Sequence, residues 1–195
     1  MSTRNSDRPY HHGELAPALR TSARAILEED GLEALSLRSV ARRAGVSHAA
    51  PYRHYASREA LLADVACDGL AQLRAELAQA AAAPGEKSER IVNIGTAYLR
   101  FACRHSGLIR LFFGSELRNR SDFPGLAEAT AAIGDDIGRA LNDPAAGLVA
   151  WAAMHGLAML ILENIVDLGQ RQAGLDVAPS RAGILLRSFV ENLQE

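Results

Sequence analysis

Cysteine is scarce in this chain, with Cys67 and Cys103 the two thiols among 195 residues. They are too few and too far apart for a disulfide framework or for a zinc site of the usual ligand spacing. Free thiols packed in helices are the ordinary outcome, and a redox-sensing role is the weaker interpretation. No apolar run follows the first charged residues as it would in a signal peptide, so a cytoplasmic location is expected.

The chain also lacks an excess of positive charge and any strand pattern. Its 21 basic and 23 acidic residues give a net charge of −2, which by itself does not point to nucleic acid. Through Ala60, however, nine arginines face seven acidic residues, so a modest positive bias lies in the N-terminal part. Apolar residues recur at helical spacing, and no alternating run of β-branched residues is long enough for a strand. We expect an all-α fold.

Catalytic and metal-binding constellations are missing too. Cys103 and His105 lie two residues apart and would point to different helix faces, while His155 and Glu163 are two helical turns apart. A metal site from the adjacent His11 and His12 with another ligand has no support from residue spacing. We therefore expect no enzymatic activity, no metal and no cofactor.

The most informative stretch is residues 36–62, which predicts two short helices around a glycine turn. Ser36 can cap the first helix, and Gly45 can end it because glycine adopts positive φ without a Cβ penalty. The apolar stripe of this helix consists of Leu37, Val40 and Ala41. Ser47 is placed to cap a second helix over residues 48–54, which Pro51 shortens without forbidding. This order of caps and turn predicts a helix-turn-helix.

In helix-turn-helix proteins the second helix enters the DNA major groove, and its first residues face base edges. Alanine methyls contact thymine methyls, a histidine donates to purine acceptors, and arginine or tyrosine reaches phosphate or guanine. For any single position, packing or a solvated face is the alternative interpretation; the ordered set favours DNA binding. The predicted DNA-binding residues are Arg38, Ser47, His48, Ala49, Ala50, Tyr52, Arg53, His54 and Arg58.

Residues 10–65 resemble the N-terminal domain of the tetracycline-repressor-like (TetR) family of bacterial transcription regulators. The resemblance rests on Tyr-His-His-Gly-Glu-Leu at residues 10–15, on Leu-Ser-Leu-Arg-x-Val-Ala-x-x-Ala-Gly-Val-Ser-x-x-x-x-Tyr-x-His-Tyr at 35–55, and on Ser-Arg-Glu-Ala-Leu-Leu at 57–62. It implies contacts to bases or nearby backbone by Arg38, His48, Ala49 and Tyr52, and to phosphate by His54 and Arg58. The family often has lysine at position 58 and Gly-Thr or Pro-Thr at 49–50, so the base preference stays open.

The remaining pattern predicts further helices and two domains. Expected helices cover residues 14–30, residue 57 to the Pro84-Gly85 break, and residues 86–105, 108–113, 125–141, 145–162 and 179–193. We expect a flexible N-terminal arm at 1–13, whose arginines could reach a minor groove, then a three-helix DNA-binding domain at 14–74. A C-terminal helical bundle for dimerisation and effector binding is expected at 75–195.

The segment 145–162 contains no charged residue and so needs burial on every side. Its length touches the minimum for a membrane span, but it is rich in alanine and glycine and has His155 at its middle, so a central bundle helix fits better. This helix and the last one, paired with those of a second subunit, would make a four-helix interface. A homodimer places two reading helices on half-sites about 34–36 Å apart or a multiple of that.

Trp151, His155 and Gly156 resemble a motif in the effector domains of one branch of the family. The i, i+4 spacing puts indole and imidazole on one helix face, where a structural role is favoured over direct ligand contact. The predicted ligand-binding set is Phe101, Phe112, Trp151, Met154 and His155. The resemblance implies a repressor released from a palindromic DNA operator by a small-molecule effector; the alternative is a DNA-binding protein without effector control.

Overall fold

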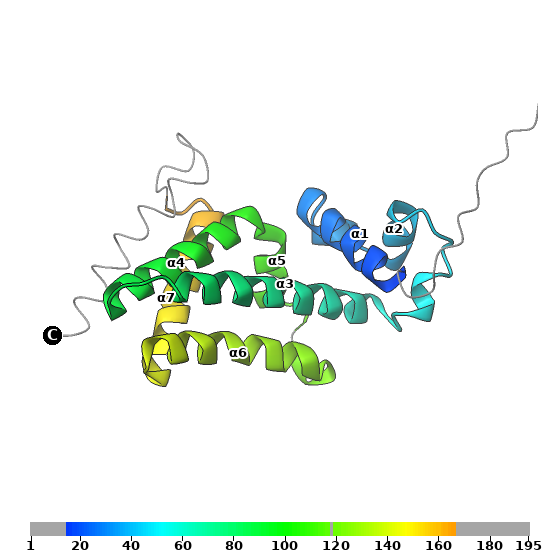
Figure 1. Cartoon of the computed structure of the whole chain (residues 1–195). Coiled ribbons are helices and arrows are strands. Elements are labelled where there is room, and N and C mark those ends of the chain that lie inside the picture. The colour runs from blue at the N-terminus through cyan, green and yellow to red at the C-terminus, as the bar shows by residue number, and fades with distance from the viewer. Residues whose placement is uncertain (1–14, 118, 167–195) are drawn as a thin grey trace, which may run out of the picture. The chain divides into compact units, whose positions relative to one another are not determined.

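The computed structural model describes residues 15–117 and 119–166, and these form helices joined by turns, without a strand among them (Figure 1). The all-α prediction is confirmed. The α-helices are α1 (Leu15–Glu29), α2 (Leu37–Arg43), α3 (Arg58–Ala81), α4 (Lys87–Arg104), α5 (Ser106–Phe113), α6 (Pro124–Leu141) and α7 (Pro144–Leu162). Short 3-10 helices are η1 (Leu32–Ala34), η2 (Pro51–Arg53) and η3 (Arg120–Asp122). The predicted N-terminal arm and the predicted helix 179–193 lie outside the described residues.

The chain divides into two compact units between Val65 and Ala66, a point that falls inside α3. The boundary predicted from the sequence, after residue 74, lies further along the same helix. α3 therefore contributes its first two turns to the N-terminal unit and the rest of its length to the C-terminal unit.

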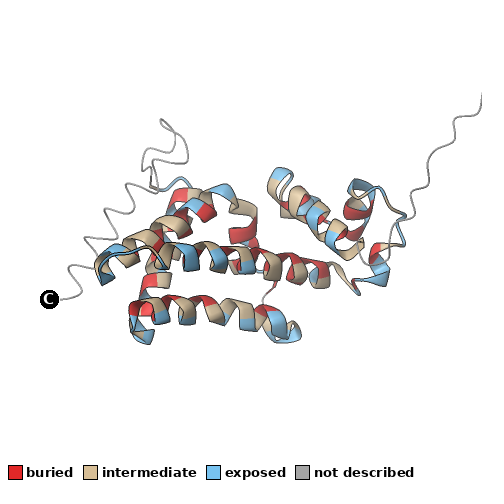
Figure 2. Ribbon diagram, in the orientation of Figure 1, coloured by how far each residue is buried: buried red, intermediate tan, exposed pale blue. Residues whose placement is uncertain are grey.

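Apolar faces of α1, α2 and the start of α3 make the core of the N-terminal unit (Figure 2). Its buried side chains include Leu19, Ala23, Ile26, Leu27, Leu37, Val40, Ala41, Leu61, Leu62 and Val65. Gly31 follows α1 with φ +84° and Gly45 follows α2 with φ +69°, a region that costs other residues a Cβ clash. These two glycines allow the chain to reverse twice within a short unit.

The start of α2 is closed by a reciprocal cap. The Ser36 hydroxyl accepts the Ser39 backbone N–H at 3.0 Å, and the Ser39 hydroxyl accepts the Ser36 backbone N–H at 2.9 Å. Two backbone donors that the helix leaves unpaired are thereby satisfied. The cap at Ser36 was expected; the return bond from Ser39 was not.

Close packing and ion pairs hold the C-terminal unit together. A Cβ placed on Gly69 of α3 would lie 2.9 Å from side-chain atoms of Leu108 and Phe112 in α5, so glycine lets these helices approach. Arg74 of α3 pairs with Asp136 of α6 at 2.6 Å, and Arg104 of α4 pairs with Glu76 of α3 at 2.5 Å.

Helix α7 packs mainly on α6 and on α4. The Asp143 carboxylate caps it by accepting the Ala146 N–H at 3.0 Å, and Pro144 occupies its first turn, as expected. A Cβ on Gly147 would lie 2.5 Å from the Gly138 Cα and 2.9 Å from the Gly134 carbonyl oxygen of α6. The two helix backbones are thus in direct contact at Gly147.

The expectation that α7 is buried on every side is not met within the described residues. We define its outer face by the exposed residues Ala145, Leu148, Val149, Ala152, Gly156 and Leu160. Leu148 is 62% exposed. By length and composition alone α7 could cross a membrane, with a mean hydropathy of 1.9 and 28% of its apolar window buried. Such a helix also occurs as a core helix, and composition does not say what covers its outer face.

Candidate functional site

The segment after Gly45 differs from the helix predicted over residues 48–54. Residues 48–50 form a turn and Pro51–Arg53 a single 3-10 turn, so the predicted α-helix is wrong. An α-helix there would need a bond from the residue 51 N–H to the Ser47 carbonyl, and proline has no N–H. The Ala50 N–H bonds to that carbonyl instead, at 2.9 Å, and the Arg53 N–H bonds to Ala50 at 3.2 Å.

This segment is anchored from behind and exposed in front. Pro51 and Tyr55 are buried, while Tyr52 between them is 62% exposed. Seven of the nine predicted DNA-binding residues are exposed, namely Arg38, Ser47, His48, Ala49, Tyr52, Arg53 and His54. Ala50 and Arg58 are half-buried. The turn therefore presents its polar and aromatic side chains to solvent on a fixed backbone.

Arg58 has internal partners. Its Nε donates to the Leu35 carbonyl at 2.7 Å, and its Nη2 donates to the Leu32 carbonyl at 2.9 Å. The guanidinium at the start of α3 thus ties down the loop that precedes α2. Its contact with phosphate stays a prediction, and loss of this side chain would also affect the fold.

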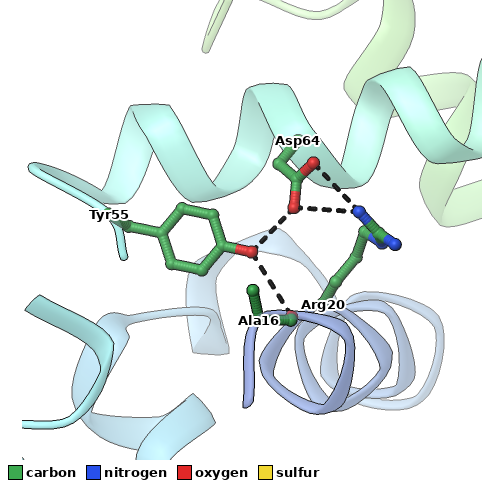
Figure 3. A network of polar contacts seen from close by, with 4 residues as sticks. All are labelled: Ala16, Arg20, Tyr55 and Asp64. Atoms are coloured by element: carbon green, nitrogen blue, oxygen red, sulfur yellow. Dashed lines mark hydrogen bonds and ion pairs between the residues drawn. The ribbon is translucent and has the colours of Figure 1, made fainter. Parts of the chain in front are cut away.

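A second network links α1, Tyr55 and the start of α3 (Figure 3). The Tyr55 hydroxyl donates to Asp64 Oδ2 at 2.7 Å, and Arg20 Nη1 donates to Asp64 Oδ1 at 3.1 Å. The same hydroxyl lies 3.5 Å from the Ala16 carbonyl oxygen. Burial and the bond to Asp64 raise the pKa of Tyr55, which stays a neutral donor. This network was not predicted from the sequence. The one sign of it in the sequence is the single carboxylate, Asp64, among the apolar residues from Leu61 to Val65.

Within the described part of the chain, some of the arginines near the turn are paired with a carboxylate and others are not. Arg43 pairs with Glu29 at 2.6 Å, and this pair ties the end of α2 to α1. Arg38, Arg42 and Arg53 are exposed and form no ion pair with any residue that the structure describes. Exposed guanidinium groups of this kind bind phosphate or a guanine edge.

An aromatic cluster lies between α4, α5 and α7 of the C-terminal unit. The Tyr98 hydroxyl is 3.1 Å from His155 Nδ1, and the Phe113 ring centroid is 3.8 Å from that of His155. The Phe113 and Trp151 ring centroids are 6.0 Å apart. Trp151 also lies over Gly134, where an added Cβ would be 3.5 Å from the indole. We call Tyr98, Phe113, Trp151 and His155 the aromatic cluster.

The structure brings three of the five predicted ligand residues close together. Trp151 and His155 share the cluster, and Phe112 adjoins it through Phe113, with 6.3 Å between their ring centroids. Phe101 instead contacts His105, at 4.8 Å, and Met154 is fully buried. Tyr98 and Phe113 were not in the predicted set.

The Trp151 indole leaves one polar atom poorly satisfied. Its Nε1 is buried and has no acceptor in hydrogen-bond geometry within the described residues. It lies close enough to the Tyr98 hydroxyl to oppose the rise that burial causes in the Tyr98 pKa. A buried N–H without a good acceptor costs about 1–3 kcal/mol, so an oxygen placed here would be stabilised.

Burial lowers the pKa of His155 from 6.5. The folded state therefore favours neutral imidazole, while the unfolded state binds a proton below pH 6.5. We expect the contribution of His155 to the free energy of unfolding to be fully present above pH 6.5 and to decrease as the pH falls below it. Denaturation of the protein and of His155→Gln between about pH 7.5 and pH 5.5 measures it, because the variant should lose less stability. An equal loss in both would contradict the prediction.

A cavity of the C-terminal unit lies away from the aromatic cluster. A cavity of about 470 Å³ opens between α3, α4 and α6, and none of the five predicted ligand residues lines it. No group of three or more His, Cys, Asp or Glu side chains able to hold a metal ion occurs within the described ranges.

Comparison with known sequences identifies both units. Residues 19–65 match the tetR family of bacterial regulatory proteins, and residues 91–176 match the tetracyclin repressor-like C-terminal domain. A comparison with curated proteins finds no match.

Solved structures share the fold over nearly the whole chain. A protein of unknown function from Rhodococcus sp. RHA1 is 30% identical, with a TM-score of 0.69 over 93% of this chain and 98% of that one. A tetR-family regulatory protein from Rhodococcus RHA1 is 18% identical, with a TM-score of 0.69 over 90% and 96%. The multidrug binding protein EbrR, solved with imidazole, is 19% identical, with a TM-score of 0.68 over 96% of both chains.

The matches to both domains agree with the capped α2, the glycine turn and the exposed segment after it. The chain belongs to the tetR family of bacterial regulatory proteins, which are DNA-binding transcription regulators and not enzymes.

Proposed function

We propose that the protein is a cytoplasmic repressor that binds a palindromic operator and leaves it when a small molecule binds the C-terminal unit. The observation that carries the first part is the exposed segment of residues 47–54, held on buried Pro51 and Tyr55. The proposed DNA-binding residues remain the nine predicted ones. His48 and Ala49 at the start of the segment would face base edges, and Tyr52 and Arg53 would contact backbone or guanine.

Selection from random duplex DNA with the purified full chain at near-physiological salt tests this proposal. A short palindrome is expected among the enriched sequences, because two-fold symmetric readers select two-fold symmetric sites. Enrichment no better than for arbitrary DNA would leave the alternative, a DNA-binding protein without sequence preference or effector control.

The contribution of phosphate contacts is testable at Arg53. We expect Arg53→Ala to weaken binding to all sequences alike and to lower the slope of log affinity against log salt by about one, since one fewer counterion is released. Arg100→Ala is the matched control, because Arg100 is an exposed arginine of the C-terminal unit. Fluorescence anisotropy across a salt series gives both slopes; a loss confined to the operator would instead assign Arg53 to base reading.

We propose that the outer face of α7 is covered by a second copy of the chain. The face is apolar, and its exposed members include Leu148 at 62% and Val149 at 48%. An apolar surface of this kind is stabilised by removal from water. Sedimentation velocity at micromolar concentration is expected to give a dimer, and a monomer would remove the geometric basis for a palindromic site.

The aromatic cluster is the proposed place for the effector. Trp151 Nε1 offers a poorly satisfied donor, and Tyr98 and His155 offer a second polar pair beside it. Trp151 is the single tryptophan of the chain, so its fluorescence reports on this cluster. A compound that releases the protein from its operator is expected to change that emission, and a releasing compound that leaves it unchanged would place the effector elsewhere.

A further inference from the structure

The cavity between α3, α4 and α6 has an apolar floor and a charged rim. Its floor consists of Leu77, Ile94 and Ile137, each at most 3% exposed. One wall is made of Ala78 and Ala81 at the end of α3 and of Ala82 just after it, whose single methyl groups leave the space open. A volume of about 470 Å³ is within the range of about 300–1,000 Å³ typical of small-molecule sites.

The rim carries more positive than negative charge. Arg90 and Arg139 line it together with one carboxylate, that of Asp136. Both Asp136 oxygens are already engaged, one by Arg74 Nε at 2.6 Å and the other by Arg139 Nη2. Arg90 donates from Nη1 to the Ala140 carbonyl at 2.9 Å and has no carboxylate partner among the described residues. A ligand with one negative charge would therefore balance this rim.

The helix ends at the cavity do not cancel that charge. Arg90 lies in the first turn of α4, whose backbone N–H groups carry partial positive charge. Ala140 lies in the last turn of α6, whose carbonyl groups carry partial negative charge. The two partial charges offset one another, so the side chains decide the sign.

We propose that this cavity binds a small amphipathic carboxylate, with its apolar body on Leu77, Ile94 and Ile137 and its carboxylate on the Arg90 guanidinium. The planar guanidinium fork matches two carboxylate oxygens, which favours this anion over a bulkier charged group. The site is separate from the aromatic cluster, shares no residue with it, and goes beyond the proposed function. Binding here requires no DNA.

Octanoate is the probe, added to the full-length protein labelled at isoleucine and methionine methyl groups. The Ile94 and Ile137 methyl resonances are expected to shift on titration, while Met154, buried on α7, is expected to stay in place. Octylamine, of similar length and opposite charge, should bind at least about tenfold more weakly, because it meets the cationic rim.

Substitutions test separately the role of the Arg90 charge and the role of the cavity volume. Arg90→Gln should weaken octanoate binding about tenfold, and Arg90→Lys should weaken it less because the charge is kept while the fork is lost. Arg100→Gln on the same helix should leave it unchanged. Ala81→Leu should fill the cavity and abolish the shifts, whereas Ala75→Leu, on an exposed part of α3 outside the lining, should not. Thermal melting identifies any variant that fails to fold. If one of Arg90→Gln and Ala81→Leu is lost in this way, the other variant and its control still test the proposal.

Equal affinity for octanoate and octylamine, or binding that survives both Arg90→Gln and Ala81→Leu, would overturn the proposal. Shifts at Met154 without shifts at Ile94 would also overturn it, because they would place the carboxylate at the aromatic cluster. The DNA selection is a separate measurement, so failure of this site and failure of the proposed function are distinguishable.

Discussion

Replacement of Tyr52 by alanine is expected to weaken operator binding about ten- to a hundredfold while leaving the free energy of unfolding unchanged. A specific contact to a base or its adjoining phosphate contributes about 1–3 kcal/mol, and each 1.4 kcal/mol is a factor of about ten in affinity. Because the side chain is 62% exposed, its removal opens no cavity in the core. Titration of the selected operator by anisotropy, with urea denaturation alongside, measures both quantities.

Tyr55→Phe is the matched control for Tyr52→Ala. It removes the buried hydroxyl that donates to Asp64 at 2.7 Å, so it should lower the free energy of unfolding by roughly 1–3 kcal/mol. The two tyrosines thus have opposite expected signatures, one in affinity and one in stability. Unchanged operator affinity in Tyr52→Ala would contradict the proposed docking of residues 47–54.

Gly147→Ala is expected to destabilise the C-terminal unit by about 1–3 kcal/mol or more. The new methyl group would lie 2.5 Å from the Gly138 Cα, and backbone atoms cannot move aside as a flexible side chain can. Either α6 and α7 separate or both bend, and each outcome loses packing along the most extensive helix–helix contact among the described residues. Urea denaturation followed by circular dichroism measures the change.

Gly156→Ala on the same helix is the control, compared at several protein concentrations because Gly156 lies on the outer face that a second copy is proposed to cover. Within one protomer a Cβ at Gly156 meets nothing within 4 Å, and alanine in a helix interior is favoured over glycine by roughly 0.5–1 kcal/mol. We therefore expect a small gain in stability, of opposite sign to Gly147→Ala. Equal effects at the two positions would show that helix propensity, and not the contact with α6, governs both.

The features that sequence predicted well depend on local chemistry. Ser36 and Asp143 cap helices because a side-chain oxygen lies within reach of a nearby N–H, and Gly45 takes positive φ because it lacks a Cβ. Such requirements are complete within a few residues of chain. The helix predicted over residues 48–54 failed for a local reason as well. Pro51 has no N–H to donate to the Ser47 carbonyl, and the N–H groups of Ala50, Arg53 and His54 each bond to the third residue before them.

Contacts between distant helices could not be predicted in the same way. Tyr98 and His155 are 57 residues apart in the sequence. The apolar pattern of each helix is compatible with packing against several different helices, so it does not predict this contact. Composition correctly indicated that α7 is apolar all round, but it could not show that Leu148 is exposed. Periodicity identifies which face of a helix is apolar and does not identify what that face meets.

The division of the chain inside α3 determines how the N-terminal unit can be isolated. A fragment ending at Val65 would leave Asp64 in the last turn of a cut helix, where carbonyl groups have no partners and the turn frays. The hydrogen bonds of Tyr55 and Arg20 to the Asp64 carboxylate would then depend on a frayed helix end. A fragment extended to Ala81 keeps this carboxylate in a helix interior, so the shortest stable DNA-binding piece is expected to include residues that belong to the other unit.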